Sequence, residues 1–213
     1  MSLPRAVSYP IPEPDCPQRV DWVVDPSRAV LLIHDMQDHF VRTYDRGRDP
    51  WRTAVPNMVA LRAAARKAGV PVVYTAQPGD QDPEERALLA DFWGPGLVAA
   101  DEAVIDELRP EAGDVLLTKW RYSAFAKTDL AERMRAWERD QLVIVGIYAH
   151  IGVMTTALDA FMRDVQPYVV GDAVADFTAE DHAHAIRHVA ARCGRVQTTA
   201  AVASALSEAE VTA

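Results

Sequence analysis

Six short strand-like segments, most of them continuously apolar, are separated by helical patterns and constrain the fold of this chain more than any other feature. They cover residues 29–33, 70–74, 114–118, 141–146, 167–171 and 195–199. Strands that are apolar throughout, rather than at alternate positions, are typical of parallel sheets covered on both faces. Between them, apolar residues recur at helical spacing, as at Leu130, Met134 and Trp137 and again at Met154, Leu158, Phe161 and Met162. The sequence predicts an α/β three-layer sandwich with a six-stranded, mainly parallel sheet flanked by helices.

The length of 213 residues suits one domain with a substantial core. Residues 28–200 contain all six apolar segments and are predicted to form that domain. The first 18 residues include five prolines and no long apolar stretch, so we expect residues 1–27 to form an extended N-terminal arm packed on the domain rather than a secretory signal. Residues 201–213 are predicted to form a C-terminal tail, a weak helix that frays.

Charge and cysteine content exclude several classes of function. The net charge of −9 comes with scattered basic residues, which disfavours nucleic-acid binding. No run of 18 apolar residues is present, so we expect no membrane span. Cys16 and Cys193 are too few and too far apart for a disulfide framework, which fits the reducing cytoplasm. An anionic substrate would have to be held by a few local cations against this acidic surface.

Polar side chains follow four of the predicted strands at the end where parallel sheets bind ligands. Asp35 comes two residues after the first strand, and Gln77 follows the second, Lys119 and Tyr122 the third, and Tyr148 the fourth. One carboxylate, one ammonium, an amide and two phenols are therefore predicted to converge at one edge of the sheet.

Asp35 and Lys119 each have a structural alternative. An Asp after a strand often caps a turn or helix. A Lys at a strand end can extend its ammonium to water. A carboxyl beside an apolar strand end is also a candidate acid with a perturbed pKa, and a buried Lys requires a partner, so an Asp35–Lys119 pair is the functional interpretation.

The other reactive residue types point to no second site. His34 is interpreted as a hydrogen-bonded core residue. His182, His184 and His188 are interpreted as a solvated helix face, with a metal site as the alternative. No glycine-rich phosphate-binding motif occurs. Thiol catalysis is disfavoured because the helix start after the fourth strand, residues 151–153, contains no cysteine.

Long motifs at successive strand ends resemble those of the isochorismatase family, within the cysteine-hydrolase-like superfamily. The resemblance extends from about Tyr9 to the last strand. The motifs are AVLLIHDMQDHF (29–40), VYTAQPGD (73–80), DFWGPG (91–96), TKWRYSAF (118–125), GIYAHIGVMTTALDAFMRD (146–164) and DAVADF (172–177).

The resemblance implies roles for particular residues. Asp35 would be the catalytic acid and Lys119 its partner, while Gly152 would stand where thiol amidases of the superfamily carry cysteine. A cis peptide would precede Tyr148. No metal and no cofactor would be needed, and the protein would be a homodimer. The implied substrate-binding residues are Gln77, Arg86, Trp93, Tyr122 and Tyr148.

The implied reaction is hydrolysis of the enolpyruvyl (vinyl) ether of isochorismate, a small anionic chorismate-derived substrate, to 2,3-dihydro-2,3-dihydroxybenzoate and pyruvate. One alternative is the same chemistry on 2-amino-2-deoxyisochorismate, giving trans-2,3-dihydro-3-hydroxyanthranilate. The motifs DAFMRD and HIGVMTT resemble siderophore enzymes, whereas AQPGD and a chain without a carrier domain after residue 213 resemble phenazine-type enzymes. An amidase of the superfamily and a non-catalytic docking protein are further alternatives, disfavoured by Gly152 and by Asp35 with Lys119 respectively.

Such a hydrolysis requires a protonated carboxyl over the methylene carbon and no nucleophilic side chain. Burial would raise the pKa of Asp35, whereas the Lys119 ammonium would lower it. A substrate carboxylate bound against Lys119 would offset the effect of the ammonium. Lys119 and Arg86 would then be the local cations that an acidic surface makes necessary.

Overall fold

The structure, a computed structural model, describes residues 3–13 and 16–208. Within this part of the chain, six strands form one sheet. They are β1 (Ala29–His34), β2 (Val72–Ala76), β3 (Val115–Thr118), β4 (Gln141–Ile147), β5 (Gln166–Ala175) and β6 (Arg195–Gln197). Their order is β3-β2-β1-β4-β5-β6, and each neighbouring pair is parallel. The predicted six-stranded α/β sandwich is confirmed.

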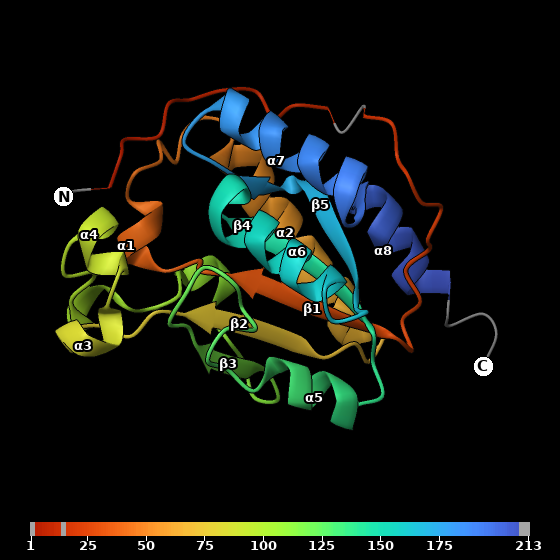
Figure 1. The fold of residues 1–213 in the computed structure, drawn as a ribbon. Coiled ribbons are helices and arrows are strands. Elements are labelled where there is room, and N and C mark those ends of the chain that lie inside the picture. The colour runs from red at the N-terminus through yellow and green to blue at the C-terminus, as the bar shows by residue number, and fades with distance from the viewer. Residues whose placement is uncertain (1–2, 14–15, 209–213) are drawn as a thin grey trace.

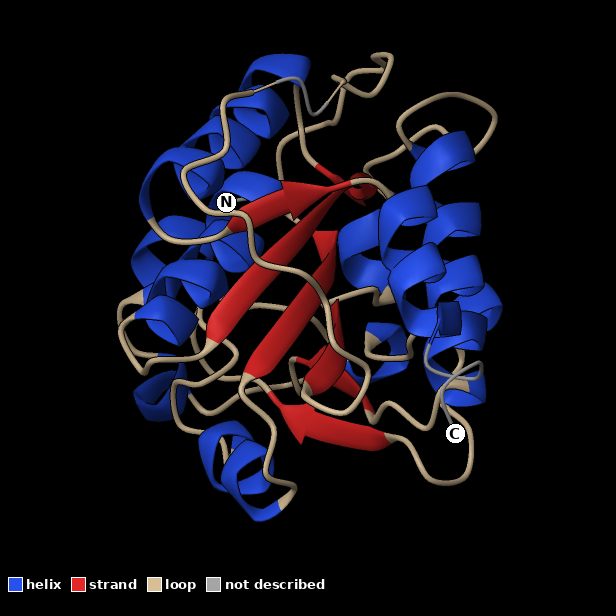
Figure 2. Ribbon diagram, turned by 90° about the vertical axis from the view of Figure 1, so that its right-hand side faces the viewer, coloured by secondary structure: helices blue, strands red, loops and turns tan. Residues whose placement is uncertain are grey.

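Helices lie on both sides of this sheet, which makes three layers (Figure 2). The longer ones are α2 (Trp51–Lys67), α5 (Leu130–Ala136), α6 (Met154–Phe161), α7 (Ala179–Arg192) and α8 (Thr199–Glu208). The short helical segments are α1 (Asp38–Val41), α3 (Pro83–Arg86), α4 (Leu89–Trp93), the 3-10 turns η1 (Ala99–Asp101) and η2 (Asp106–Leu108), and a π-helical turn, η3 (Ala149–Val153).

Alternate side chains of the central strand β1 pack into two separate hydrophobic cores, one on each face of the sheet. Leu31 and Ile33 pack into the core formed with α2 and α8. Val30 and Leu32 pack into the core formed with α5, α6 and α7. Side chains of a strand alternate between its faces, so His34 points to the second layer, where α6 begins.

The chain changes direction across the sheet between β1 and β4, and ligand sites of open parallel sheets form at such a point. Gly146 keeps these two strands close. Its φ is +113°, and a Cβ there would lie 2.3 Å from the carbonyl oxygen of His34. The carboxyl ends of β1 and β4 therefore open side by side.

The described part of the N-terminal arm is packed on the domain along the outer side of α7 (Figure 1). Val7 N donates to Phe177 O at 2.9 Å, and the Tyr9 hydroxyl lies 3.1 Å from Nδ1 of His182. His182 is fully buried, so its assignment to a solvated helix face was wrong. Its two ring nitrogens are hydrogen-bonded to the Tyr9 hydroxyl and the Gly171 carbonyl, and the helical pattern does not reveal these distant partners.

Two apolar patterns differ from what we expected. The spacing of Leu158, Phe161 and Met162 predicted a helix correctly, but these side chains are 43%, 46% and 74% exposed. In α8, by contrast, Val202 and Leu206 are buried in the core shared with α2. The expected fraying is therefore wrong for the described part of the tail, and residues 209–213 lie outside the described residues. The domain boundary at 200/201 stays a prediction.

No helix of the described residues is both long enough and apolar enough to cross a membrane.

The packing of α8 predicts that it belongs to the cooperative unit of the domain. Leu206→Ala should lower the free energy of unfolding by about 2–4 kcal/mol, because it leaves a cavity against α2. Ser207→Ala, on the exposed side of the same helix, is the control and should change it by less than about 0.5 kcal/mol. Urea unfolding measures both values. An equally small effect of Leu206→Ala would mean that α8 is dispensable for the fold.

Candidate active site

A cavity of about 1120 Å³ opens at the carboxyl ends of β1, β2, β3 and β4. All eight residues that the sequence analysis assigned to the site line it. They are Asp35, Gln77, Arg86, Trp93, Lys119, Tyr122, Tyr148 and Gly152. The structure therefore brings these side chains together at one edge of the sheet, as the sequence predicts.

Asp35 and Lys119 form a buried ion pair at the base of this cavity. Lys119 Nζ lies 2.6 Å from Asp35 Oδ2, and the two side chains are 2% and 9% exposed. Thr75, fully buried at the end of β2, donates its hydroxyl to Asp35 Oδ1 at 2.7 Å. The backbone of Asp35 has φ of +52°, the left-handed region, in which Asp is enriched among non-glycine residues. Three neighbouring strands thus hold one carboxylate.

The charge of Asp35 is decided by two opposed effects. Desolvation by burial raises the pKa of Asp35, but the Lys119 ammonium and the hydrogen bonds from Lys119 and Thr75 together hold it below its ordinary value. Asp35 is therefore ionised in the free site. The combined effect of the ammonium and the hydrogen bonds on its pKa is larger than the opposing effect of burial.

Arg86 is a second buried cation in the cavity. It ends α3 and is 4% exposed. Its guanidinium donates to the carbonyl of Gly94 and lies 3.4 Å from Gln81 Oε1. Burial lowers its pKa, and among the described residues no carboxylate pairs with it. A buried guanidinium without a carboxylate partner is suited to bind an anion.

Aromatic side chains form the walls of the cavity. Trp93 Nε1 donates to the Tyr122 hydroxyl at 2.8 Å. Tyr148 stacks on Phe177 with ring centroids 4.1 Å apart and donates its hydroxyl to the carbonyl of Phe40 at 2.8 Å. Burial raises the pKa of Tyr148. A ligand would therefore meet Tyr148 as a neutral ring rather than as an ionised phenol.

Gly152 lies in η3, where the chain turns from β4 into α6. The expected cis peptide is present between Ile147 and Tyr148. Neither Cys16 nor Cys193 lines the cavity, and burial raises the pKa of the Cys193 thiol to about 11. No thiolate faces the ion pair in the described part of the chain.

Several residues of the site were missed by sequence reasoning. Thr75 fixes the carboxyl of Asp35, and Gln37 receives a hydrogen bond from Gln77 N at 2.7 Å and donates to Gln77 O at 2.8 Å. The arm contributes residues 3 and 5–8 to the cavity wall. Polar residues at the ends of β1 and β2 were a usable signal for Thr75 and Gln37, whereas the arm carries no local signal of its position.

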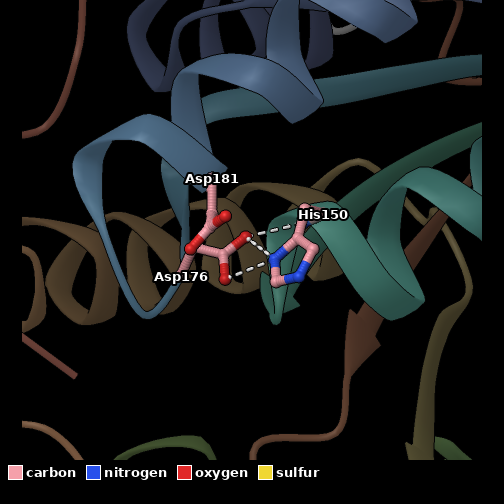
Figure 3. Close-up of side chains that lie close together, drawn as sticks. All are labelled: His150, Asp176 and Asp181. Atoms are coloured by element: carbon pink, nitrogen blue, oxygen red, sulfur yellow. Dashed lines mark hydrogen bonds and ion pairs between the residues drawn. The ribbon is translucent and has the colours of Figure 1, made fainter. Parts of the chain in front are cut away.

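A separate cluster of polar side chains contains His150 of η3, Asp176 and Asp181 of α7 (Figure 3). Nδ1 of His150 lies 2.8 Å from both carboxylate oxygens of the buried Asp176, and Asp181 is close by. The hydrogen bond with Asp176 raises the pKa of His150, and Asp181 accepts from the Thr178 hydroxyl at the start of α7. An ion pair and a helix cap account for these contacts without a metal ion.

The family model of the isochorismatase domain matches residues 29–201. The chain belongs to the isochorismatase family. The resemblance drawn from the motifs is confirmed.

Individual relatives agree with this assignment. The chain is 53% identical to "Isochorismatase" of Bacillus subtilis (strain 168) over 91% of its own length, but spans only 63% of that protein. It is 49% identical to "Phenazine biosynthesis protein PhzD" of Pseudomonas fluorescens, covering 92% of this chain and 96% of that one. A solved structure of a cysteine hydrolase from Pseudomonas syringae pv. phaseolicola 1448A superposes with a TM-score of 0.81 at 26% identity, over 92% and 99% of the two chains.

The contact between Thr75 and Asp35 predicts a pH-dependent loss of stability. Thr75→Val removes a donor to a buried carboxylate and should lower the free energy of unfolding at pH 7 by about 2 kcal/mol. A carboxyl whose folded pKa is lowered stabilises the fold above its unfolded value, about 3.9, and loses that effect as pH falls through the folded value. The deficit of the Val variant should therefore shrink below about pH 4.

Thr75→Ser retains the hydroxyl and is the matched control, expected to keep most of the stability. Urea unfolding between pH 3 and 7 measures all three proteins. A deficit that stays constant across this range would show that Thr75 acts by packing rather than through the charge of Asp35.

Proposed function

We propose that this chain hydrolyses the enolpyruvyl ether of isochorismate, giving 2,3-dihydro-2,3-dihydroxybenzoate and pyruvate, with Asp35 as the general acid. The observation that carries the proposal is a carboxyl held between Lys119 and Thr75 at the base of a cavity in which no described thiol or metal-binding group competes for the substrate. The isochorismatase domain and its relatives support the same reaction.

The charges around the cavity suit a dianionic substrate. Five basic side chains and two carboxylates line it, although the whole chain carries a net charge of −9. Arg86 is the buried cation without a carboxylate partner among the described residues, so we assign one substrate carboxylate to it. The second carboxylate, on the enolpyruvyl group, would approach Lys119. Arg5, Arg42 and Arg48 at the cavity wall would draw the anion in.

The chemistry follows from the bond that breaks. Asp35 transfers its proton to the terminal CH₂ of the vinyl ether, which becomes a methyl group on an oxocarbenium carbon. Water adds to that carbon and returns a proton to the Asp35 carboxylate, so the acid is restored. The resulting hemiketal collapses to pyruvate and the ring alcohol. No side chain forms a bond to the substrate, so a glycine suffices at position 152.

Binding of the substrate would itself cause the protonation of Asp35. In the free site Lys119 holds Asp35 ionised. A substrate carboxylate against the same ammonium would offset its effect, and exclusion of water would then let desolvation raise the pKa of Asp35. Once the proton has moved to carbon, the carboxylate of Asp35 faces a developing cation, an attraction realised mainly in the transition state.

The amino analogue, 2-amino-2-deoxyisochorismate, is the second candidate substrate, favoured by the 49% identity to PhzD over 96% of that protein. It carries the same vinyl ether and would undergo the same steps. Amide hydrolysis is disfavoured by Gly152, and a purely docking role by the buried Asp35–Lys119 pair. A homodimer and a cytoplasmic location stay predictions from the family resemblance and the cysteine content.

Release of pyruvate tests the proposed reaction directly. The protein is incubated separately with isochorismate and with its 2-amino analogue, and pyruvate is followed through a coupled lactate dehydrogenase. We expect turnover with at least one substrate. Asp35→Asn should lower kcat by about 100- to 10,000-fold, the range that general acid catalysis contributes, while binding persists. Turnover of neither substrate, or a wild-type rate in Asp35→Asn, would refute the proposal.

Proton uptake on binding tests the origin of the acid. A reduced analogue, with a 1-carboxyethyl ether in place of the enolpyruvyl group, has no vinyl carbon to protonate. At a pH between the free and bound pKa of Asp35, binding should take up about one proton, because the pKa rises as the anion offsets Lys119. Calorimetry in buffers of different ionisation enthalpy measures this number. Asp35→Asn should bind with no uptake from this position, and equal uptake in both proteins would exclude Asp35.

A further inference from the structure

Position 152 is closed to any side chain by a neighbour on the central strand. A Cβ built on Gly152 would lie 2.1 Å from Cε1 of His34, 2.9 Å from its Nε2 and 3.0 Å from its Nδ1. The φ of Gly152 is outside the left-handed region. Glycine is also a poorer helix former than alanine, so the backbone does not require it there. The imidazole of His34 is what requires it.

The ring of His34 cannot move aside at low cost. It is fully buried on β1 and is bonded at both nitrogens. Nδ1 donates to the carbonyl of Ile147 at 2.9 Å. Nε2 accepts from the Thr156 hydroxyl, and the distance between Nε2 and Thr156 Oγ1 is 3.3 Å. That hydroxyl also accepts from Ala124 N, which leaves its proton for the imidazole. Displacing the ring would leave the Ile147 carbonyl and the Thr156 hydroxyl without these partners.

The ring is held in its neutral form. Desolvation by burial lowers the pKa of His34 to about 4, although the nearby Asp35 opposes this shift. Nδ1 lies 3.6 Å from Asp35 Oδ2. At neutral pH the imidazole therefore adds bulk and one N–H next to the ion pair, and no charge.

The space that the ring occupies is chemically important. Gly152 lines the cavity with Asp35 and Lys119, at the first turn after β4. Helix starts and neighbouring ammonium groups lower the pKa of a thiol and activate it as a nucleophile. A side chain at 152 would therefore meet the substrate in competition with Asp35.

We propose that His34 is a specificity-determining residue: its imidazole fills the space that a nucleophilic side chain at position 152 would need, and so leaves Asp35 as the group that faces the substrate. His34 and Gly152 then act as one unit, and neither can be replaced by a larger residue alone. The catalytic meaning of this pair rests on the proposed vinyl ether hydrolysis. The steric coupling does not, and it is tested first.

The experiment compares the thermal unfolding midpoint of four variants with that of the wild type. Gly152→Ala adds only the Cβ. His34→Asn retains a donor for the Ile147 carbonyl and removes Cε1 and Nε2, the two nearest atoms. The third variant combines both changes. Gly47→Ala is the matched control: Gly47 is exposed, is also outside the left-handed region, and its Cβ would meet nothing closer than Asp45 Oδ1 at 3.3 Å.

Gly152→Ala should lower Tm by about 5–10 °C, since overpacking of a fixed interior is destabilising. The same change in the His34→Asn background should alter Tm by no more than about 1 °C, and Gly47→Ala should leave it unchanged to about 1 °C. If Gly152→Ala fails to fold, restoration of folding by His34→Asn supports the coupling. A wild-type Tm in Gly152→Ala, or an equal loss in both backgrounds, overturns it.

Alkylation by iodoacetamide, mapped to residue 152 by mass spectrometry, tests the chemical half of the proposal. In His34→Asn/Gly152→Cys the thiol has room beside Lys119, and we expect alkylation at pH 7 at least 10-fold faster than in Gly152→Cys alone. Equal rates would mean that the imidazole does not guard this position. Because neither readout uses the substrate, a failure here is distinguishable from a failure of the proposed hydrolysis, which pyruvate release reports.

Discussion

The buried contact between the Asp35 carboxylate and the Lys119 ammonium is the interaction on which the rest of this structure depends. An unpaired charge at either position would be destabilising by about 3–5 kcal/mol, whereas the pair with its added hydrogen bond is tolerated. The two residues follow β1 and β3, and Thr75 on the intervening β2 completes the contact. The register of three parallel strands is therefore tied to the geometry of one carboxylate.

Much of this arrangement could be predicted from the sequence because it follows from local rules. Most of the predicted strand segments are continuously apolar, as expected for strands covered on both faces, and all six lie within a few residues of the bounds in the structure. The rule that ligands bind at the carboxyl ends of parallel strands then selected Asp35 and Lys119 without reference to a family. Arg86 and Trp93 follow no strand directly, so only the family motifs could indicate them.

The features that sequence reasoning missed depend on contacts between distant parts of the chain. Residues 3 and 5–8 line the cavity. The next residue of the arm, Tyr9, is held by His182, which is distant in the sequence. The pKa of Asp35 could not be given a direction until the distance to Lys119 was known, since burial and the ammonium act in opposite senses. The spacing of Phe161 in α6 predicts a helix, but not which of its faces is buried.

Under the proposed mechanism, in which Asp35 is the acid, a site that keeps this carboxyl ionised until an anion binds would select anionic substrates. A neutral ligand would enter without disturbing the Lys119–Asp35 attraction, so the carboxyl would stay charged and could protonate nothing. A ligand with a carboxylate near Lys119 would weaken that attraction, and Asp35 would then take up the proton that the proposed reaction requires. The neutral ring of His34 and the backbone of Gly152, among the described residues near Asp35, add neither charge nor nucleophile, which fits the proposed role of Asp35. The substrate's own charge is then the variable that sets the protonation state of Asp35.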